Sequence, residues 1–84
     1  MTTIHDVRET ALAVLGRIAP EADLDHLDPT GSIQEELDLD SFDFLQFIEG
    51  LHEELGVEIP ERDYPKVASL DGCVRYLEGV LTPG

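Results

Sequence analysis

The sequence predicts an all-α fold, a small bundle of three main helices plus one short helix, with a long loop between the first and second main helices. Two observations carry this prediction. Apolar residues recur at helical spacing in three separate segments, and no segment shows the apolar/polar alternation that is typical of a strand. A chain of 84 residues can bury one small core. We therefore expect a single domain over residues 1–84, ordered from about 3 to 81.

The first helix is expected over about residues 3–19, and Pro20 favours its end. Thr3 is a suitable cap for this helix. Its apolar face comprises Ile4, Val7, Ala11, Val14, Leu15 and Ile18. Residues 20–40 are rich in turn formers, so we expect mostly a loop there. Four apolar residues should hold that loop against the core: Leu24, Leu27, Ile33 and Leu37.

The second main helix is expected over residues 41–55, ending at Gly56, since glycine readily adopts the left-handed backbone found after helices. Residues 57–60 should be extended, because Pro60 disfavours a helix before it. A short helical turn over residues 61–64 should be cut off by Pro65. The last helix should span residues 70–81 with Ser69 as its cap, and residues 82–84 should form a tail. Its buried stripe comprises Leu70, Val74, Leu77 and Leu81.

The charge of the chain restricts the classes of partner. The formal net charge is −14, and residues 18–61 contain 14 of the 19 Asp and Glu residues but no Lys or Arg. Such a surface repels nucleic acid and favours enzymes with basic patches, through contacts that weaken with salt. No apolar run is long enough to insert into a membrane, and no signal peptide is recognisable. We therefore expect a cytoplasmic monomer.

One exposed aromatic residue stands out on the helix over residues 41–55. A helical wheel places Phe42 on the polar side, among Asp43, Gln46, Glu49 and Glu53. The opposite, core-facing side carries Phe44, Phe47, Ile48, Leu51 and Leu55, with Leu45 at its edge. An apolar side chain ringed by charge is typical of a docking surface. The alternative is a lone exposed apolar residue, which is common on protein surfaces.

Ser41 begins the same helix. Either Ser41 or Asp40 can serve as the helix cap, and a helix N-terminus also favours a phosphate ester, because its free N–H groups attract an anion. His52 lies about three turns away and cannot activate Ser41 as a base, and the sequence has no Gly-x-Ser-x-Gly motif. We therefore expect no catalytic residue and no enzymatic activity. The spacing of Cys and His residues predicts no metal site.

Two segments resemble the acyl carrier protein family. Residues 36–43, which read Glu-Leu-Asp-Leu-Asp-Ser-Phe-Asp, resemble the Asp-Ser-Leu motif of that family, and residues 56–60 are similar to its Gly/Asp-x-x-Ile-Pro segment. The resemblance covers essentially the whole chain. It implies that a phosphopantetheinyl transferase attaches 4′-phosphopantetheine, taken from coenzyme A, to Ser41. It also implies that Asp40 helps to present Ser41 to that transferase.

The resemblance implies a docking role for further residues. Phe42 would be the exposed apolar anchor, and Ile59 would lie beside the arm. Three acidic residues would meet the basic patches of acyl-loading and acyl-transferring enzymes: Asp43, Glu49 and Glu53. We therefore expect a free-standing carrier that shuttles thioester-bound cargo in fatty-acid, polyketide or related biosynthesis.

Some residues depart from the family pattern. Asp38 replaces a frequent glycine, and Asp tolerates a left-handed backbone better than most residues. Gln46 stands where many fatty-acid carriers have an acid. Phe44 and Phe47 are bulkier than is usual, which predicts a smaller or reshaped cargo pocket in a specialised carrier.

Alternative functions stay open at this point. Within the carrier class, residues 39–42 also resemble D-alanyl and aminoacyl carriers. Outside that class, the chain could be an acidic interaction module without a prosthetic group, in which Ser41 is only a cap. A calcium loop at Asp23, Asp25 and Asp28 lacks the order of ligands found in an EF-hand. Cys73 borders the buried stripe of the last helix, where a packed thiol is expected.

Overall fold

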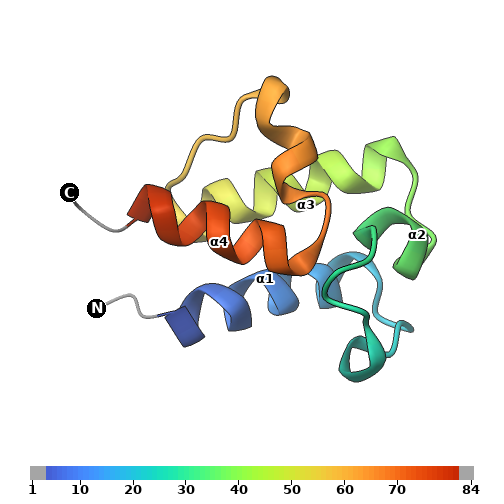
Figure 1. Ribbon diagram of the computed structural model, residues 1–84. Helices are drawn as coiled ribbons and strands as arrows, with labels where there is room; N and C mark the ends of the chain where they lie inside the picture. The colour runs from blue at the N-terminus through green and yellow to red at the C-terminus, as the bar shows by residue number, and fades with distance from the viewer. Residues whose placement is uncertain (1–3, 82–84) are drawn as a thin grey trace.

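The computed structural model describes residues 4–81, and every regular element in that range is helical (Figure 1). This confirms the predicted all-α bundle with three main helices. The cap expected at Thr3 and the tail expected at residues 82–84 lie outside the described residues. The elements in chain order are α1 (Ile4–Ile18), η1 (Leu24–His26), α2 (Ile33–Leu37), α3 (Ser41–Leu55), η2 (Glu61–Val67) and α4 (Leu70–Leu81), where η denotes a 3-10 helix.

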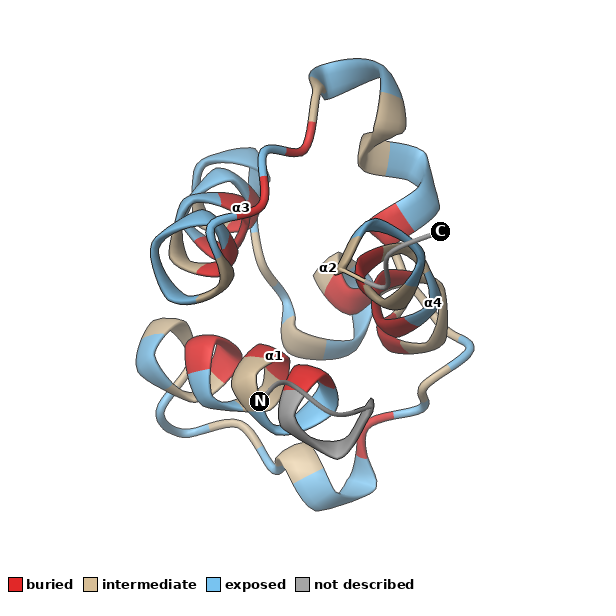
Figure 2. Ribbon diagram, turned by 90° about the vertical axis from the view of Figure 1, so that its left-hand side faces the viewer, coloured by how far each residue is buried: buried red, intermediate tan, exposed pale blue. Residues whose placement is uncertain are grey.

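The core lies between the three long helices. α1 packs against α3 and α4, and α4 packs against η2. Figure 2 shows that the buried residues of α1, α3 and α4 lie on the sides that face one another. From Val7 onward, the inward faces are those that the helical periodicity predicts, and Ile4 lies outside the described side chains. The fully or almost fully buried residues include Ala11, Leu15, Phe44, Phe47, Leu51, Leu70 and Leu77.

Two glycines serve the long helix α3. Gly56 ends it with φ of 68°, and its N–H donates to the carbonyl of His52 at 2.8 Å, as the sequence predicts. Gly50 faces α1, where a Cβ atom would lie only 2.5 Å from Cγ1 of Val14. The missing side chain at Gly50 therefore allows α1 and α3 to approach closely.

The segment over residues 20–40 is more helical than expected. It contains η1 and α2, each begun by a side-chain cap: Asp23 accepts from the N–H of Asp25 at 3.2 Å, and Ser32 accepts from the N–H of Glu35 at 3.3 Å. Asp38 ends α2 in the left-handed conformation, with φ of 55°. The prediction that apolar residues hold this segment to the core is confirmed by Leu24, Leu27, Ile33 and Leu37.

The short helix after Pro60 is also longer than expected. We expected it to end before Pro65, but η2 runs through Pro65 to Val67. Proline lacks an N–H, so the helix loses the one hydrogen bond that residue 65 would otherwise donate. The carbonyl of Pro65 still accepts from the N–H of Ala68 at 3.4 Å, and Val67 is fully buried. The described range thus holds three short helices instead of the single one predicted.

A pair of glycine variants tests the packing of α1 on α3. Gly50→Ala should lower the free energy of unfolding by about 1–3 kcal/mol, because the new methyl group overpacks the contact with Val14. Gly79→Ala should raise it by about 0.5–1 kcal/mol, because alanine favours a helix and the site is open. Urea unfolding of both variants gives the comparison. Equal changes in the free energy of unfolding for the two variants would contradict a close approach of α1 and α3 at Gly50.

Candidate functional site

The first turn of α3 is closed by reciprocal hydrogen bonds between Asp40 and Asp43. Asp40 has an extended backbone, and its Oδ1 accepts from the N–H of Asp43 at 2.8 Å. In return, Oδ2 of Asp43 lies 3.5 Å from the N–H of Asp40, which donates to it. This capping box satisfies two free N–H groups at once. Asp40 is therefore the cap of α3, and Ser41 is not.

Ser41 is the exposed first residue of α3. The other two serines have structural roles: Ser32 accepts from the N–H of Glu35, and Ser69 accepts from the N–H of Gly72 at 3.0 Å. The surroundings of Ser41 fit a phosphate ester. Ser41 is exposed to solvent, and the positive end of the 15-residue helix α3 favours an anion. Of the three serines, Ser41 is thus the one whose side chain caps no helix.

A groove runs from Ser41 between α3 and η2. Its volume is about 400 Å³, and it is lined by Gln34, Ser41, Phe44, Leu45, Glu61, Tyr64, Pro65 and Ala68. The ring centroids of Phe44 and Tyr64 lie 5.9 Å apart in an edge-to-face arrangement. The sequence analysis did not foresee Tyr64 or Glu61 at this site, because their approach to α3 depends on how η2 packs.

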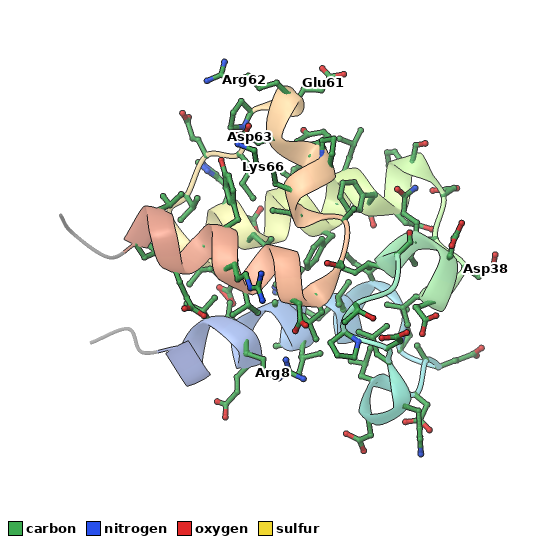
Figure 3. The ribbon with its side chains drawn as sticks, in the orientation of Figure 1. Arg8, Asp38, Glu61, Arg62, Asp63 and Lys66 are labelled. Atoms are coloured by element: carbon green, nitrogen blue, oxygen red, sulfur yellow. The ribbon has the colours of Figure 1, made fainter. Side chains whose placement is uncertain are left out.

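One hydrogen bond holds η2 to α4. The hydroxyl of Tyr76 donates to Oδ2 of Asp63 at 2.7 Å, and Nζ of Lys66 lies 3.4 Å from the other oxygen of Asp63. Figure 3 shows Asp63 and Lys66 along η2, while Glu61 and Arg62 point outward from its first turn. The partners are 13 residues apart, so no local sequence pattern marked them.

This hydrogen bond shifts both titrations. It lowers the pKa of Asp63 below its ordinary value of 3.8, with Lys66 adding to the effect. It also raises the pKa of Tyr76 above its ordinary value of 10.0. Both shifts follow because the bond needs a charged carboxylate and a protonated phenol. The contact between η2 and α4 is therefore strongest between these two pH limits.

The predicted docking residues divide between two regions of the structure. Phe42, 66% exposed, lies beside Ser41 on the outer face of α3, as the helical wheel predicts. Ile59 is buried, with 8% exposed. Instead of lining the groove beside Ser41, it lines a second groove of about 570 Å³ with Ile48, Glu49, His52, Glu53, Glu58 and Pro60. Glu58 is an acidic residue of this second groove that the sequence analysis missed.

The remaining candidates have structural roles. Nδ1 of His52 lies 3.2 Å from the carbonyl of Val57, and His26 contacts Asp23. Cys73 is fully buried, and burial raises the pKa of its thiol to about 12, which confirms a packed thiol. Within the described part of the chain, no three His, Cys, Asp or Glu side chains could hold a metal ion together. None of the helices over residues 4–81 is long and apolar enough to cross a membrane.

Tyr76→Phe should lower the free energy of unfolding at neutral pH, because it removes the bond to Asp63. A carboxylate with a lowered pKa stabilises the fold above its unfolded pKa and loses this effect as the pH falls. A phenol with a raised pKa stabilises the fold below its unfolded pKa, and this stabilisation is lost as the pH rises. The difference from the parent should therefore shrink below 3.8 and above 10.0.

Urea unfolding across this pH range measures the effect, and Tyr64→Phe serves as the control from the neighbouring helix. The free energy of unfolding of Tyr64→Phe should depend on pH in the same way as that of the parent. A constant difference between Tyr76→Phe and the parent at every pH would show that the hydrogen bond does not link η2 to α4.

Comparison with known proteins assigns the family. A family model described as a phosphopantetheine attachment site matches residues 5–77. An acyl carrier protein of Campylobacter hominis is 30% identical over 80 residues, which cover 95% of each chain. That of Wolinella succinogenes is 28% identical over 78 residues, 93% of this chain and 96% of the relative. Mitochondrial acyl carrier protein 2 of Arabidopsis thaliana is 31% identical over 72 residues, 86% of this chain and 56% of that protein.

The family match also assigns the cofactor, 4′-phosphopantetheine. Proteins of this kind are carriers and not enzymes, and they work with a phosphopantetheinyl transferase and with biosynthetic enzymes. The match spans most of the chain, and the relatives match it over nearly their whole length in the two bacterial cases. The chain belongs to the acyl carrier protein family.

Proposed function

We propose that Oγ of Ser41 bears the phosphopantetheine arm, and that the chain carries an acyl or related cargo between enzymes of fatty-acid, polyketide or related biosynthesis. One observation carries this proposal. Asp40 caps α3, which leaves Ser41 exposed at the first helical position with no capping role. An exposed hydroxyl at the positive end of a long helix is well suited to a phosphate ester.

The residues of the chain position the arm. When bound, phosphopantetheine supplies the thiol that holds the cargo as a thioester. The capping box fixes the first turn of α3, so the direction in which Ser41 points is set by the fold. The groove between α3 and η2 provides a wall along one side of the arm. A tethered cargo reaches a partner's active site at a high effective concentration, without catalysis by the carrier.

The attachment site can be tested by intact mass. After incubation with coenzyme A, magnesium and a broad-specificity phosphopantetheinyl transferase, the parent should gain one phosphopantetheine group and Ser41→Ala should gain none. Ser69→Ala is the matched control, because Ser69 is a helix cap, and it should be modified like the parent. Modification of Ser41→Ala would refute attachment at Ser41. An unmodified parent, with several transferases, would favour an acidic interaction module.

We propose that enzymes dock on the outer face of α3. Phe42 is 66% exposed, and Leu45, one turn later, is 42% exposed. Asp43 lies within the same turn, and Glu49 and Glu53 are exposed further along the helix. An apolar anchor beside carboxylates fits a partner with an apolar pocket and a basic rim. Asp43 is half-buried in the capping box, so its docking contribution should be smaller than that of the two glutamates.

Phe42→Ala should raise the KM of the transferase for the carrier about tenfold, which corresponds to the loss of one anchoring side chain. Glu53→Gln should have a smaller effect that disappears at high salt. The control is Val80→Ala, which removes an apolar side chain of similar exposure, 51%, from α4. If Val80→Ala weakened the interaction as much as Phe42→Ala, the docking face would not be α3.

A further inference from the structure

Three aromatic rings form a continuous row from the groove beside Ser41 into the core. Tyr64 lines the groove and is half-buried, Phe44 is 6% exposed, and Phe47 is fully buried. The centroid of the Phe44 ring lies 5.9 Å from that of Tyr64 and 6.1 Å from that of Phe47. Both separations fall within the contact range of aromatic pairs. The row therefore connects the lining of the groove between α3 and η2 with the core.

This row closes the route from the groove to the interior. An apolar chain that enters between Phe44 and Tyr64 needs van der Waals contact with both rings, so the rings must move apart by about 4 Å. Phe44 belongs to a core that also holds the fully buried residues Leu51, Val67 and Leu77. Because protein interiors are closely packed, an entering chain must displace these side chains as well.

The helix that carries Tyr64 is tied down at two places. The hydroxyl of Tyr76 binds Asp63 on the α4 side at 2.7 Å. Just after η2, the carbonyl of Ala68 accepts from the N–H of Ile33, at the beginning of α2, at 2.7 Å. Movement of η2 away from α3 would strain or break these bonds. The ring pair is therefore held closed by neighbouring structure, in addition to its own contact.

We propose that Phe44 and Tyr64 determine the class of cargo by keeping it outside the helical bundle. The carried acyl group rests in the open groove, where the side chains of Gln34 and Glu61 offer polar partners. Such a site suits short or polar acyl groups, which expose little apolar surface to water. It does not suit a long alkyl chain, which needs an apolar interior. This inference rests on the proposed carrier function.

The test compares two cargoes on the same carrier. A broad-specificity transferase loads the chain from acetyl-coenzyme A and from octanoyl-coenzyme A, and intact mass confirms each product. If neither acyl group can be loaded, the carrier function itself is contradicted. Intact mass shows this before the cargo proposal is tested. The measurements are the rate at which hydroxylamine cleaves the thioester and the melting temperature of each loaded form. In the parent, both cargoes should be cleaved at rates within about twofold of each other, with equal melting temperatures, because neither is buried.

Two variants shorten the aromatic row. Phe44→Ala leaves an apolar cavity, and such cavities take up apolar ligands, so cleavage of the octanoyl thioester should slow at least about fivefold while that of the acetyl thioester stays unchanged. Tyr64→Ala, at the half-buried end of the row, opens the same route with less risk to folding. Val80→Ala, on the exposed surface of α4, is the control and should behave as the parent.

Two results would overturn the proposal. The first is slower cleavage of the octanoyl than of the acetyl thioester in the parent, accompanied by a higher melting temperature, since the long chain would then be sheltered. The second is equal cleavage of both cargoes in Phe44→Ala and in Tyr64→Ala, since the rings would then not be what excludes the chain.

Discussion

The hydrogen bond from the N–H of Asp43 to Oδ1 of Asp40, at 2.8 Å, determines the arrangement of the whole site. It sets the residue at which α3 begins, and a cap of this kind contributes about 0.5–2 kcal/mol to stability. With Asp40 as the cap, Ser41 becomes the first helical residue and its hydroxyl faces solvent. At about 100° per residue, the same starting point turns Phe42 outward and Phe44 inward. One local contact thus separates the proposed attachment point, the proposed docking face and the core face.

The inward face of α3 then determines what the bundle can hold. Burial of an aromatic side chain contributes about 1.5–3 kcal/mol, and the contacts of Phe44 with Phe47 and Tyr64 add to this. These gains help to offset the self-repulsion of a chain with a net charge of −14. A core filled in this way gains stability, but the same filling removes space for an apolar cargo. Each methylene group left in water forfeits about 0.8 kcal/mol, so our proposal implies cargoes with few methylene groups.

The sequence predicted the parts of the fold that local rules control. The bounds of α3 and α4 agree with the structure, because Gly56 marks the end of α3 and both helices are long enough to show periodicity. The five residues of α2 span little more than one turn, which is too short for a periodic signal, so its caps decide its position. Pro65 predicts a helix stop, yet η2 continues through it to the buried Val67.

In the candidate site too, local features could be predicted from the sequence, whereas features that depend on packing could not. The exposure of Phe42 followed from its place on the helical wheel. The choice of Asp40 as the cap could not be made from the sequence, since serine and aspartate cap helices about equally well. The groove between α3 and η2 depends on the bond from Tyr76 to Asp63, which joins residues distant in sequence. The path of the chain after Gly56 buries Ile59 in the second groove, and its position beside the arm stays a prediction.

The most direct test of this account is the hydrogen exchange rate of the Asp43 amide, measured by NMR in the protein with and without the arm on Ser41. The capping box uses Asp40 and leaves the hydroxyl of Ser41 free, so the account predicts the same protection of this amide in both forms. Loss of protection once the arm is attached would show that Ser41 takes part in the cap, and it would contradict the separation of the two roles.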